Sequence, residues 1–371
     1  MKKLRLACVV GARPNFMKMA PLLRAFEAYP HVETVLIHTG QHYDRNLSDV
    51  FFEELGIKHP DVSLNVGSGS HGVQTAQILE KIEGVLQNAA SENDPFDRLV
   101  VVGDVNSTMA AALAAVKLGI PVAHVEAGLR SFDRTMPEEI NRIVTDSISD
   151  MLLVSEPSGI ENLKREGKPD EQLHLVGNVM IDTLLHLLPK AKQGDVLTRY
   201  ELSPGEYGLV TLHRPANVDD PKILEALLDV LIEVSQKLKL IFPIHPRTEK
   251  RITDFGLMEK LKSASNLVLA PPLGYLDFLA LSSQAKVIVT DSGGLQEEST
   301  VLGVPCLTLR PNTERPCTTE GGTSTLIGND AALLHRCLND VVAGRYKEGK
   351  ALDVWDGKAA ERIASVIVER C

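Results

Sequence analysis

Short apolar runs alternate along most of the chain with longer segments in which apolar residues recur every three or four positions. This alternation is typical of βαβ units around a parallel sheet. In the first half it predicts strands at 4–10, 34–38, 99–102, 121–125 and 151–154, and helices at 18–28, 73–89, 107–118 and 138–149. In the second half it predicts strands at 207–212, 239–244, 267–270, 287–290 and 306–309, with a helix at 222–238.

The pattern predicts an α/β fold with two Rossmann-like, doubly wound domains. A chain of 371 residues, 44% of them hydrophobic, exceeds the usual size of a single core. A strand-like stretch at 174–176 closes the first series, so we expect the domains at 1–178 and 179–356. Because ligands bind beyond the carboxyl ends of parallel strands, we expect the domains to face each other across a cleft that holds the site.

Charge and composition narrow the class of partner. The formal net charge is −10, and lysine and arginine form no cluster, which argues against a nucleic-acid partner. The five cysteines contain no C-x-x-C pair, so neither a disulfide framework nor a cysteine-rich zinc site is expected. No stretch approaches the roughly 20 apolar residues of a membrane span, and the basic N-terminus reads as a first buried strand. We predict a cytoplasmic protein that binds a small molecule and no membrane.

Two loops have the composition of anion sites. The first strand runs into Gly11-Ala12-Arg13-Pro14-Asn15, and Lys18 follows on the next helix. The alternative is that both cations are ordinary solvated charges. This loop is not G-x-G-x-x-G, so a dinucleotide fingerprint is missing here, and no Walker A sequence occurs in the chain; NAD binding and P-loop ATP hydrolysis are not supported.

The second loop follows the strand at 287–290 and contains Ser292, Gly293 and Gly294. Free amides at the start of the next helix favour a diphosphate, and Glu298, a turn later, is suited to accept hydrogen bonds from ribose hydroxyls. The alternative is an ordinary capped helix, with Asp291 or Ser292 as N-cap and Glu297 or Glu298 as first-turn acids.

Three acidic residues end or follow strands in the first half: Asp104, Glu126 and Glu138. Asp104 can instead cap the next helix, and Glu138 can pair with Arg142 four residues on. Glu126 follows an almost wholly apolar strand, where an ionised carboxylate is costly unless it is partnered or functional.

In the second half, two strands end in a histidine with an arginine close by, at His213-Arg214-Pro215 and at His245-Pro246-Arg247. Two such pairs at equivalent strand ends indicate a site for a polyanion.

Eight motifs in order, GARPNFMKMAP, VVGDVNST, HVEAGLRS, MPEEINR, TLHRPANV, IHPRT, TDSGGLQEE and NTERP, resemble the non-hydrolysing UDP-N-acetylglucosamine (UDP-GlcNAc) 2-epimerase family from residue 4 to about residue 328. The resemblance implies the two-domain architecture of GT-B glycosyltransferases, with a C-terminal helix at 357–371 returning to the first domain. It also implies a homodimer, a UDP-sugar substrate, and neither cofactor nor metal.

The resemblance assigns a role to each candidate residue. The phosphate and nucleotide contacts are Arg13, Lys18, Ser292, Gly293, Gly294 and Arg315, with Glu298 on the ribose, Phe278 beside the uracil, and Arg247 and Leu273 in the same substrate-binding set. The catalytic set is Asp104, Glu126, Glu138 and His213, with Asp104 and Glu126 as the main proton-transfer candidates. The family reaction eliminates UDP to leave a 2-acetamidoglucal and then adds UDP back, protonating carbon 2 from the opposite face.

Departures from the family pattern leave alternatives open. The segments 41–46 and 67–71 differ from those that contact an activating second UDP-GlcNAc in bacterial members, which argues against allosteric activation here. They also resemble relatives that epimerise UDP-2,3-diacetamido-glucuronate. A hydrolysing 2-epimerase usually lacks the Arg-Pro followed by Lys of the first loop. A GT-B glycosyltransferase has no need of the three carboxylates, and a UDP-sugar sensor is expected to have lost one of them.

Overall fold

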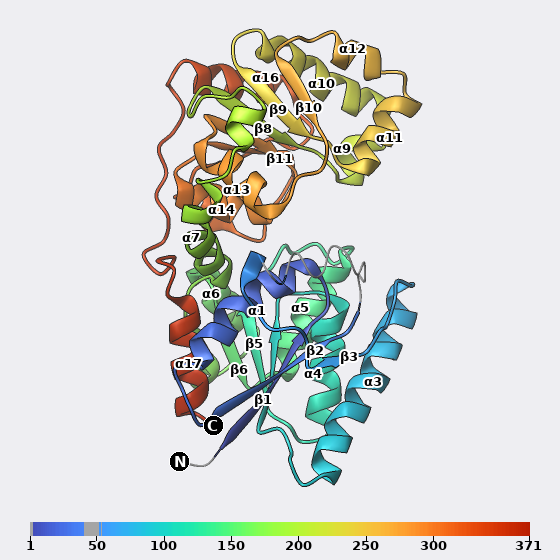
Figure 1. The fold of residues 1–371 in the computed structure, drawn as a ribbon, viewed down its shortest axis with the longest axis vertical. Coiled ribbons are helices and arrows are strands. Elements are labelled where there is room, and N and C mark those ends of the chain that lie inside the picture. Colours follow the sequence, from blue (N-terminus) through green and yellow to red (C-terminus); the bar gives the residue numbers. More distant parts are fainter. Residues whose placement is uncertain (1–2, 41–51, 53) are drawn as a thin grey trace. The chain divides into compact units, whose positions relative to one another are not determined.

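A computed structural model of the chain describes residues 3–40, 52 and 54–371. The chain divides into two compact units: unit 1 is Met1–Thr183 with Leu352–Cys371, and unit 2 is Leu184–Ala351 (Figure 1). Helix α7 (Val179–Ala191), which we expected to lie wholly in the second domain, begins in unit 1 and ends in unit 2.

Unit 1 contains one parallel sheet of seven strands in the order β3-β2-β1-β4-β5-β6-β7. Strands β4, β5 and β6 are buried along their whole length, as expected where helices cover both faces of a sheet. The strands are β1 (Leu4–Val10), β2 (Val32–His38), β3 (Val62–Ser63), β4 (Arg98–Val102), β5 (Val122–Ala127), β6 (Met151–Val154) and β7 (Leu173–Leu175).

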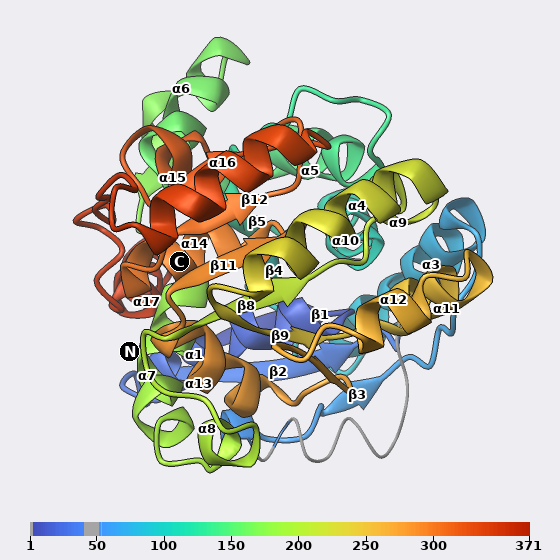
Figure 2. The same cartoon turned by 90° about the horizontal axis from the view of Figure 1, so that it is seen from above.

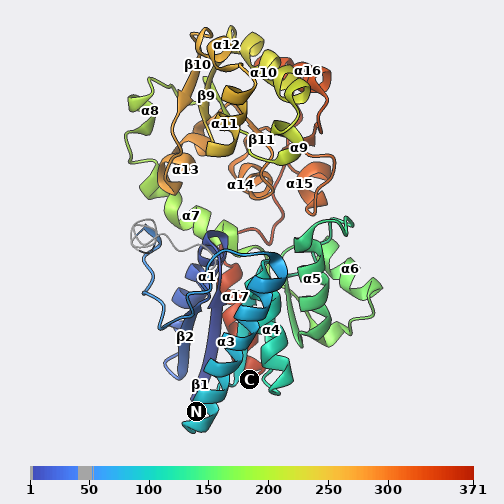
Figure 3. The same ribbon diagram turned by 90° about the vertical axis from the view of Figure 1, so that its right-hand side faces the viewer.

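Helices cover the two faces of this sheet. On one face, α3 and α4 pack apolar side chains such as Ile78 and Ile82 against Val101 and its neighbours. On the other face, α1 and α17 lie side by side (Figures 1 and 3). The helices of unit 1 are α1 (Arg13–Phe26), α3 (His71–Ser91), α4 (Asn106–Lys117), α5 (Pro137–Ile148), α6 (Pro157–Arg165), the short 3₁₀ turn η1 (Asp170–Gln172) and α17 (Ala359–Glu369).

The beginning of α7 and the returning C-terminal segment are bonded to each other within unit 1. The carboxylate of Asp182 accepts the backbone N–H groups of Ala359 and Ala360 at 3.1 and 2.7 Å, and so caps α17. The indole of Trp355 donates to the carbonyl of Ser155 at 2.9 Å. These bonds explain why the first turn of α7 belongs with unit 1.

Gly177 allows a close approach in the same region. Its φ is +90°, and a Cβ at this position would lie 2.1 Å from the carbonyl oxygen of Val354. Gly177→Ala is therefore expected to destabilise the protein by the cost of the left-handed conformation, about 1–2 kcal/mol, and by a further 1–3 kcal/mol or so for the clash.

Gly167 provides the matched control, because its φ is +82° and a Cβ there would meet nothing within 4 Å. Thermal and denaturant unfolding should show a clearly larger loss for Gly177→Ala than for Gly167→Ala. Equal losses would mean that the contact with Val354 does not constrain the fold.

Unit 2 repeats this topology with a parallel six-stranded sheet in the order β10-β9-β8-β11-β12-β13. Its strands are β8 (Tyr207–Thr211), β9 (Lys239–Pro243), β10 (Leu267–Ala270), β11 (Val287–Thr290), β12 (Cys306–Thr308) and β13 (Ser324–Leu326). The two parallel sheets confirm the predicted α/β class.

On one face of this sheet α10 and α16 lie side by side (Figures 2 and 3), and their leucines pack against strand residues such as Leu240 and Phe242. The helices are α8 (Val196–Arg199), α9 (Pro215–Val218), α10 (Pro221–Ser235), α11 (Pro246–Asp254), α12 (Met258–Lys262), α13 (Tyr275–Gln284), α14 (Gly294–Leu302), α15 (Pro316–Glu320) and α16 (Ala331–Val342). Among the described residues, no helix has the length and hydropathy needed to cross a membrane.

Candidate active site

The first predicted loop is shorter than expected, because α1 begins at Arg13, with Pro14 in its first turn. The amide oxygen of Asn15 accepts the N–H groups of Gly11 and Ala12 at 3.1 and 3.0 Å, and its amide nitrogen donates to the carbonyl of Val102 at 3.0 Å. Asn15, which the sequence did not single out, thereby joins the carboxyl ends of β1 and β4. Arg13 is exposed at this edge of the sheet.

Lys18, predicted to contact phosphate, forms a buried ion pair with Glu126 at the end of β5. This pair supplies the partner that an ionised Glu126 needs. A Cβ on Gly103 would lie 2.9 Å from Lys18 Nζ and 3.4 Å from Glu126 Oε2, so both groups pack against the backbone at the end of β4. Three neighbouring strand ends therefore contribute to one cluster in unit 1.

The backbone of Glu126 is strained. Its φ is +74°, which is uncommon outside glycine, and the pairing of β5 with β6 shifts register between Val125 and Ala127. A left-handed conformation costs a non-glycine residue about 1–2 kcal/mol. Strain of this kind at a buried carboxylate is a mark of functional sites.

Asp104 forms a second carboxylate–cation pair, with Arg142 Nη1 2.6 Å from Asp104 Oδ2. The suggestion that Asp104 caps the next helix is wrong, because the N-cap of α4 is Val105 and no side chain caps it. Arg142 also pairs with Glu139 at 2.7 Å, so the suggested pair with Glu138 is wrong as well. Helical packing places Glu139, not Glu138, on the buried face of α5.

Glu139, which the sequence did not single out, holds the loop before α5. Its oxygens accept the N–H groups of Ser131 and Phe132 at 3.0 and 2.9 Å. Burial by itself raises the pKa of Glu139, but the Ser131 bond and Arg142 outweigh it, and the net pKa is lowered. Glu138 is half-buried in the first turn of α5.

In unit 2 the structure brings together the two strand-end histidines, whose ring centroids are 5.6 Å apart. His213 Nδ1 lies 2.7 Å from Asp291 Oδ1, and Asp291 Oδ2 accepts the backbone N–H groups of His213 and Arg214. Burial raises the pKa of Asp291, but its bonds to His213 and Arg214 lower it below the ordinary value. An ionised Asp291 fixes a proton on Nδ1 of His213 and leaves Nε2 for a ligand.

The glycine turn before α14 has the features of an anion site. Its N-cap is Gly293, which has no side chain to bond the first amides of the helix. The alternative N-cap, Asp291, is wrong because its carboxylate is bonded to the β8–α9 loop. A Cβ on Gly293 would lie 3.0 Å from Arg310 Nη1, whereas one on Gly294 would meet nothing within 4 Å. Uncapped amides at a helix N-terminus attract phosphate.

Glu298 is buried one turn into α14, and its carboxyl lies 3.5 Å from the hydroxyl of Tyr275. Burial, with the nearby Glu297, raises the pKa of Glu298 to about 8. Tyr275 begins α13, which also carries the half-buried Phe278, and Leu273 lies just before that helix.

The predicted arginine contacts of unit 2 are engaged in ion pairs. Arg315 is buried, with Nε 2.6 Å from Glu297 Oε1 and Nη1 2.6 Å from Glu314 Oε1. Arg247, at the start of α11, pairs with Asp219. Both arginines thus carry acidic neighbours that offset their charge before any ligand binds.

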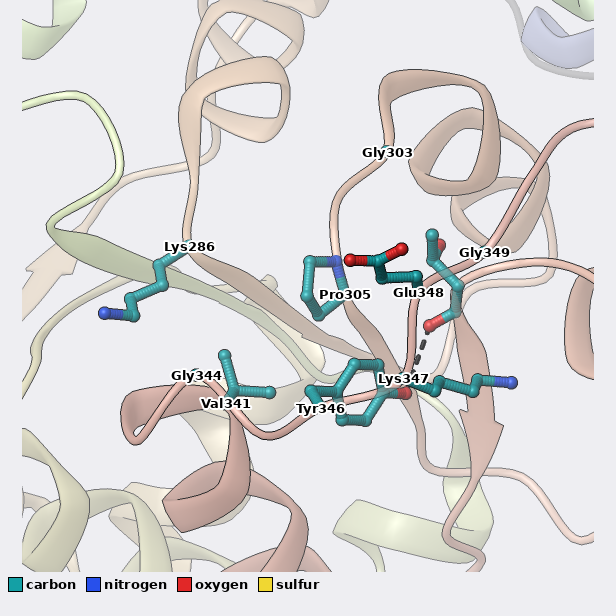
Figure 4. Close-up of a pocket in the computed structure, with 10 residues that line it drawn as sticks. Lys286, Gly303, Pro305, Val341, Gly344, Tyr346, Lys347, Glu348 and Gly349 are labelled. Carbon is teal, nitrogen blue, oxygen red and sulfur yellow. Dashed lines mark hydrogen bonds between the residues drawn. The ribbon is translucent and has the colours of Figure 1, made fainter.

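A pocket of about 420 Å³ lies at the opposite, amino end of the unit 2 strands (Figure 4). Lys286, Pro305 and Thr323, which directly precede β11, β12 and β13, line it. The hydroxyl of Tyr346 donates to the carbonyl of Thr323 at 3.0 Å. None of the predicted site residues, all of which are described, lines this pocket.

Of the two segments that depart from the family pattern, residues 41–46 lie outside the described residues. The other segment ends at His71, the first residue of α3. His71 Nδ1 lies 3.1 Å from the amide nitrogen of Asn106, the residue that begins α4. The structure thus places the end of this segment beside the start of α4.

Two parallel, doubly wound sheets with polar side chains at their carboxyl ends are the architecture of GT-B type nucleotide-sugar proteins. A crystal structure of Methanocaldococcus jannaschii UDP-GlcNAc 2-epimerase in complex with UDP-GlcNAc and UDP matches 99% of this chain and 100% of that chain, with a TM-score of 0.87 and 41% identity. The predicted GT-B fold class is therefore confirmed.

The family model for UDP-N-acetylglucosamine 2-epimerase matches residues 24–368. The UDP-N-acetylglucosamine 2-epimerase of Methanococcus maripaludis is 43% identical over 98% of both chains. The UDP-2,3-diacetamido-2,3-dideoxy-D-glucuronate 2-epimerase of Pseudomonas aeruginosa is 36% identical over 99% of this chain and 100% of its own. The chain belongs to the UDP-N-acetylglucosamine 2-epimerase family, as its motifs predicted.

Proposed function

We propose that the protein interconverts UDP-GlcNAc and UDP-N-acetylmannosamine (UDP-ManNAc) by inverting carbon 2, without releasing the free sugar. The observation that carries this proposal is the pairing of two strand-end carboxylates with buried cations, Glu126 with Lys18 and Asp104 with Arg142. Family membership and the 43% identity to an archaeal UDP-N-acetylglucosamine 2-epimerase support it.

Epimerisation at this carbon is difficult because no neighbouring carbonyl acidifies the proton. Elimination of UDP, which leaves a 2-acetamidoglucal, followed by re-addition with protonation from the opposite face, avoids this obstacle. Such a reaction needs groups that transfer protons and donors that hold the leaving diphosphate. The two strand-end carboxylates, each beside a buried cation, are suited to the first need.

We assign proton transfer to Glu126 and Asp104, with Glu138 and His213 supporting geometry and charge. The amides at Ser292, Gly293 and Gly294 would bind the diphosphate, since the N-cap of α14 is a glycine with no capping side chain. Glu298 would accept hydrogen bonds from the ribose. The remaining proposed substrate contacts are Arg13, Lys18, Arg247, Leu273, Phe278 and Arg315.

The second candidate is epimerisation of UDP-2,3-diacetamido-2,3-dideoxy-D-glucuronate, favoured by the 36% identity to the Pseudomonas aeruginosa enzyme over nearly the whole chain. Proton NMR of purified protein with each sugar in deuterium oxide decides between the candidates. UDP-ManNAc carrying deuterium at carbon 2 supports the proposal, and free N-acetylmannosamine with UDP indicates the hydrolysing class. If only the diacetamido sugar reacts, the result supports the second candidate, with the same elimination and re-addition acting on that substrate.

Glu298 gives nucleotide binding a predicted pH dependence. Its pKa of about 8 means that the protonated form dominates at neutral pH. Because an ionised carboxylate accepts two ribose hydroxyls better, binding should release a proton. UDP affinity should therefore rise with pH up to about 8, by at most roughly tenfold per pH unit.

Isothermal titration with UDP between pH 6.5 and 8.5 measures this dependence, and Glu298→Gln controls for titration of UDP itself. Folding stability follows the same linkage, because the native state binds the extra proton between the ordinary carboxyl pKa of 4.5 and about 8. Stability should therefore fall as pH rises through that window, and Glu298→Gln should remove the fall. An identical pH dependence in both proteins would show that Glu298 does not lose a proton when UDP binds.

The homodimer stays a prediction from the family resemblance, and the cytoplasmic location stays a prediction from the sequence. Light scattering of the purified protein tests the first, and a monomer would contradict it.

A further inference from the structure

A buried histidine joins the two loops that carry the proposed proton-transfer residues. His124 lies on β5, two residues before Glu126, and is fully buried. Its Nδ1 lies 2.6 Å from Asp146 Oδ1, and its Nε2 lies 2.9 Å from the carbonyl oxygen of Gly103. The proposed reaction has no step for this ring.

Both ring nitrogens of His124 have an oxygen partner. A carbonyl oxygen only accepts, so Nε2 carries a proton. Burial raises the pKa of Asp146, but the charge and hydrogen bond of His124 and the ion pair with Arg130 lower it below the ordinary value. The ring therefore bridges the Asp146 carboxylate, through Nδ1, and the Gly103 carbonyl, through Nε2. Arg130, which bonds Glu166 as well, balances the charges of the group.

Each end of this group holds one loop. Gly103, bonded to Nε2, directly precedes Asp104 and has a φ of +69°. Asp146 Oδ2 accepts the N–H of Gly128, 3.0 Å away, just beyond the strained Glu126. A backbone that costs free energy at Glu126 persists only when its surroundings over-determine it. The bonds on both sides of Glu126 provide that constraint.

We propose that His124 and Asp146 are positioning residues, which fix the loops of Asp104 and Glu126 relative to each other so that both carboxylates meet the sugar. This inference rests on the proposed function for its effect on turnover. It concerns the geometry of the reacting groups, because His124 and Asp146 are both fully buried and would act through the loops that they hold.

Three substitutions test the bond of His124 to Gly103 and its bond to Asp146 separately. His124→Asn keeps a polar group near the Nδ1 position, facing Asp146, and removes the donor to Gly103. His124→Gln keeps a donor near the Nε2 position, and Asp146→Asn removes the charge. Because misplacement of a reacting group by about 1 Å costs on the order of 10²-fold, kcat should fall by about that factor in each variant. KM should change much less than kcat, since most of the proposed nucleotide contacts lie in unit 2.

Ser149→Ala is the control, because this buried hydroxyl at the end of α5 donates only to the carbonyl of Thr145, at 2.8 Å. It should leave kcat unchanged. If the kcat losses of the three variants match that of Ser149→Ala, or vanish on cooling to a temperature where each variant is fully folded, the role is merely structural and the proposal is overturned.

Amide hydrogen exchange tests the positioning without reference to activity. Exchange at 103–104 should accelerate more in His124→Asn, and exchange at 126–128 more in His124→Gln and Asp146→Asn, while Ser149→Ala changes neither. Unchanged exchange in both loops overturns the proposal. If the wild-type protein turns over neither sugar, the proposed function fails, and exchange alone then decides whether the two loops are held in this way.

Discussion

Replacing Lys18 by methionine should lower the free energy of unfolding of unit 1 by about 3–5 kcal/mol, the usual cost of removing one partner of a buried ion pair. Lys18 and Glu126 are 8% and 7% exposed, so water compensates little for the lost ammonium. The carboxylate would then lie in an apolar strand end without Lys18. Denaturant titration, monitored by circular dichroism, measures the loss.

The double variant Lys18→Met/Glu126→Gln tests the cause of that loss. Because neutral groups of similar shape replace a buried ion pair at little cost, the second change should restore most of the lost stability. Lys164→Met is the control, since the pair of Lys164 with Asp170 is exposed and should contribute little. If the double variant is no more stable than Lys18→Met, the uncompensated charge is not the cause.

The sheets could be predicted from sequence because parallel strands covered on both faces appear as continuous apolar runs. The run at 287–290 became β11 without change, and 151–154 became β6. Helix starts were harder to place. Because a proline in the first turn has no N–H to leave unsatisfied, α1 begins at Arg13, before the apolar periodicity that predicted a start at 18.

The strand-end positions of Asp104 and Glu126 could also be predicted from the sequence, because polar residues at those points interrupt apolar runs. Their ion-pair partners could not be predicted. Lys18 is 108 residues from Glu126, and only the sheet order brings the two together. His124 is one polar residue within an apolar strand, and the sequence alone gives it no role. Its proposed role depends on its contact with Asp146, and sequence spacing does not identify that partner.

Local spacing misled where two arrangements satisfy it equally. In MPEEINR, Glu138 and Glu139 lie four and three residues before Arg142, and both spacings place side chains on one helix face. The structure selects Glu139 because only that residue faces inward, where it also bonds the loop at Ser131. Burial therefore decides which glutamate pairs with Arg142, and a local sequence pattern does not determine burial.

Glu126→Gln should lower kcat for UDP-GlcNAc by about 10²–10⁴-fold, the usual contribution of a positioned proton-transfer group. The amide has the shape of the carboxylate but cannot remove a proton. Proton NMR in deuterium oxide monitors deuterium incorporation at carbon 2, and so measures both turnover and exchange of the carbon 2 proton. UDP affinity should change much less than kcat, because most of the proposed nucleotide contacts belong to unit 2 and the amide leaves the Lys18 side chain in place.

Glu161→Gln is the matched control, because Glu161 is an exposed carboxylate of unit 1 whose pair with Arg165 lies along the surface of α6. It should keep wild-type turnover. If Glu126→Gln retains more than about a tenth of wild-type kcat, Glu126 does not transfer the proton at carbon 2. The same measurement on Asp104→Asn then becomes decisive, because Asp104 is the other carboxylate held at a strand end by a buried cation. Loss of exchange in both variants would instead support one carboxylate for each face of the sugar.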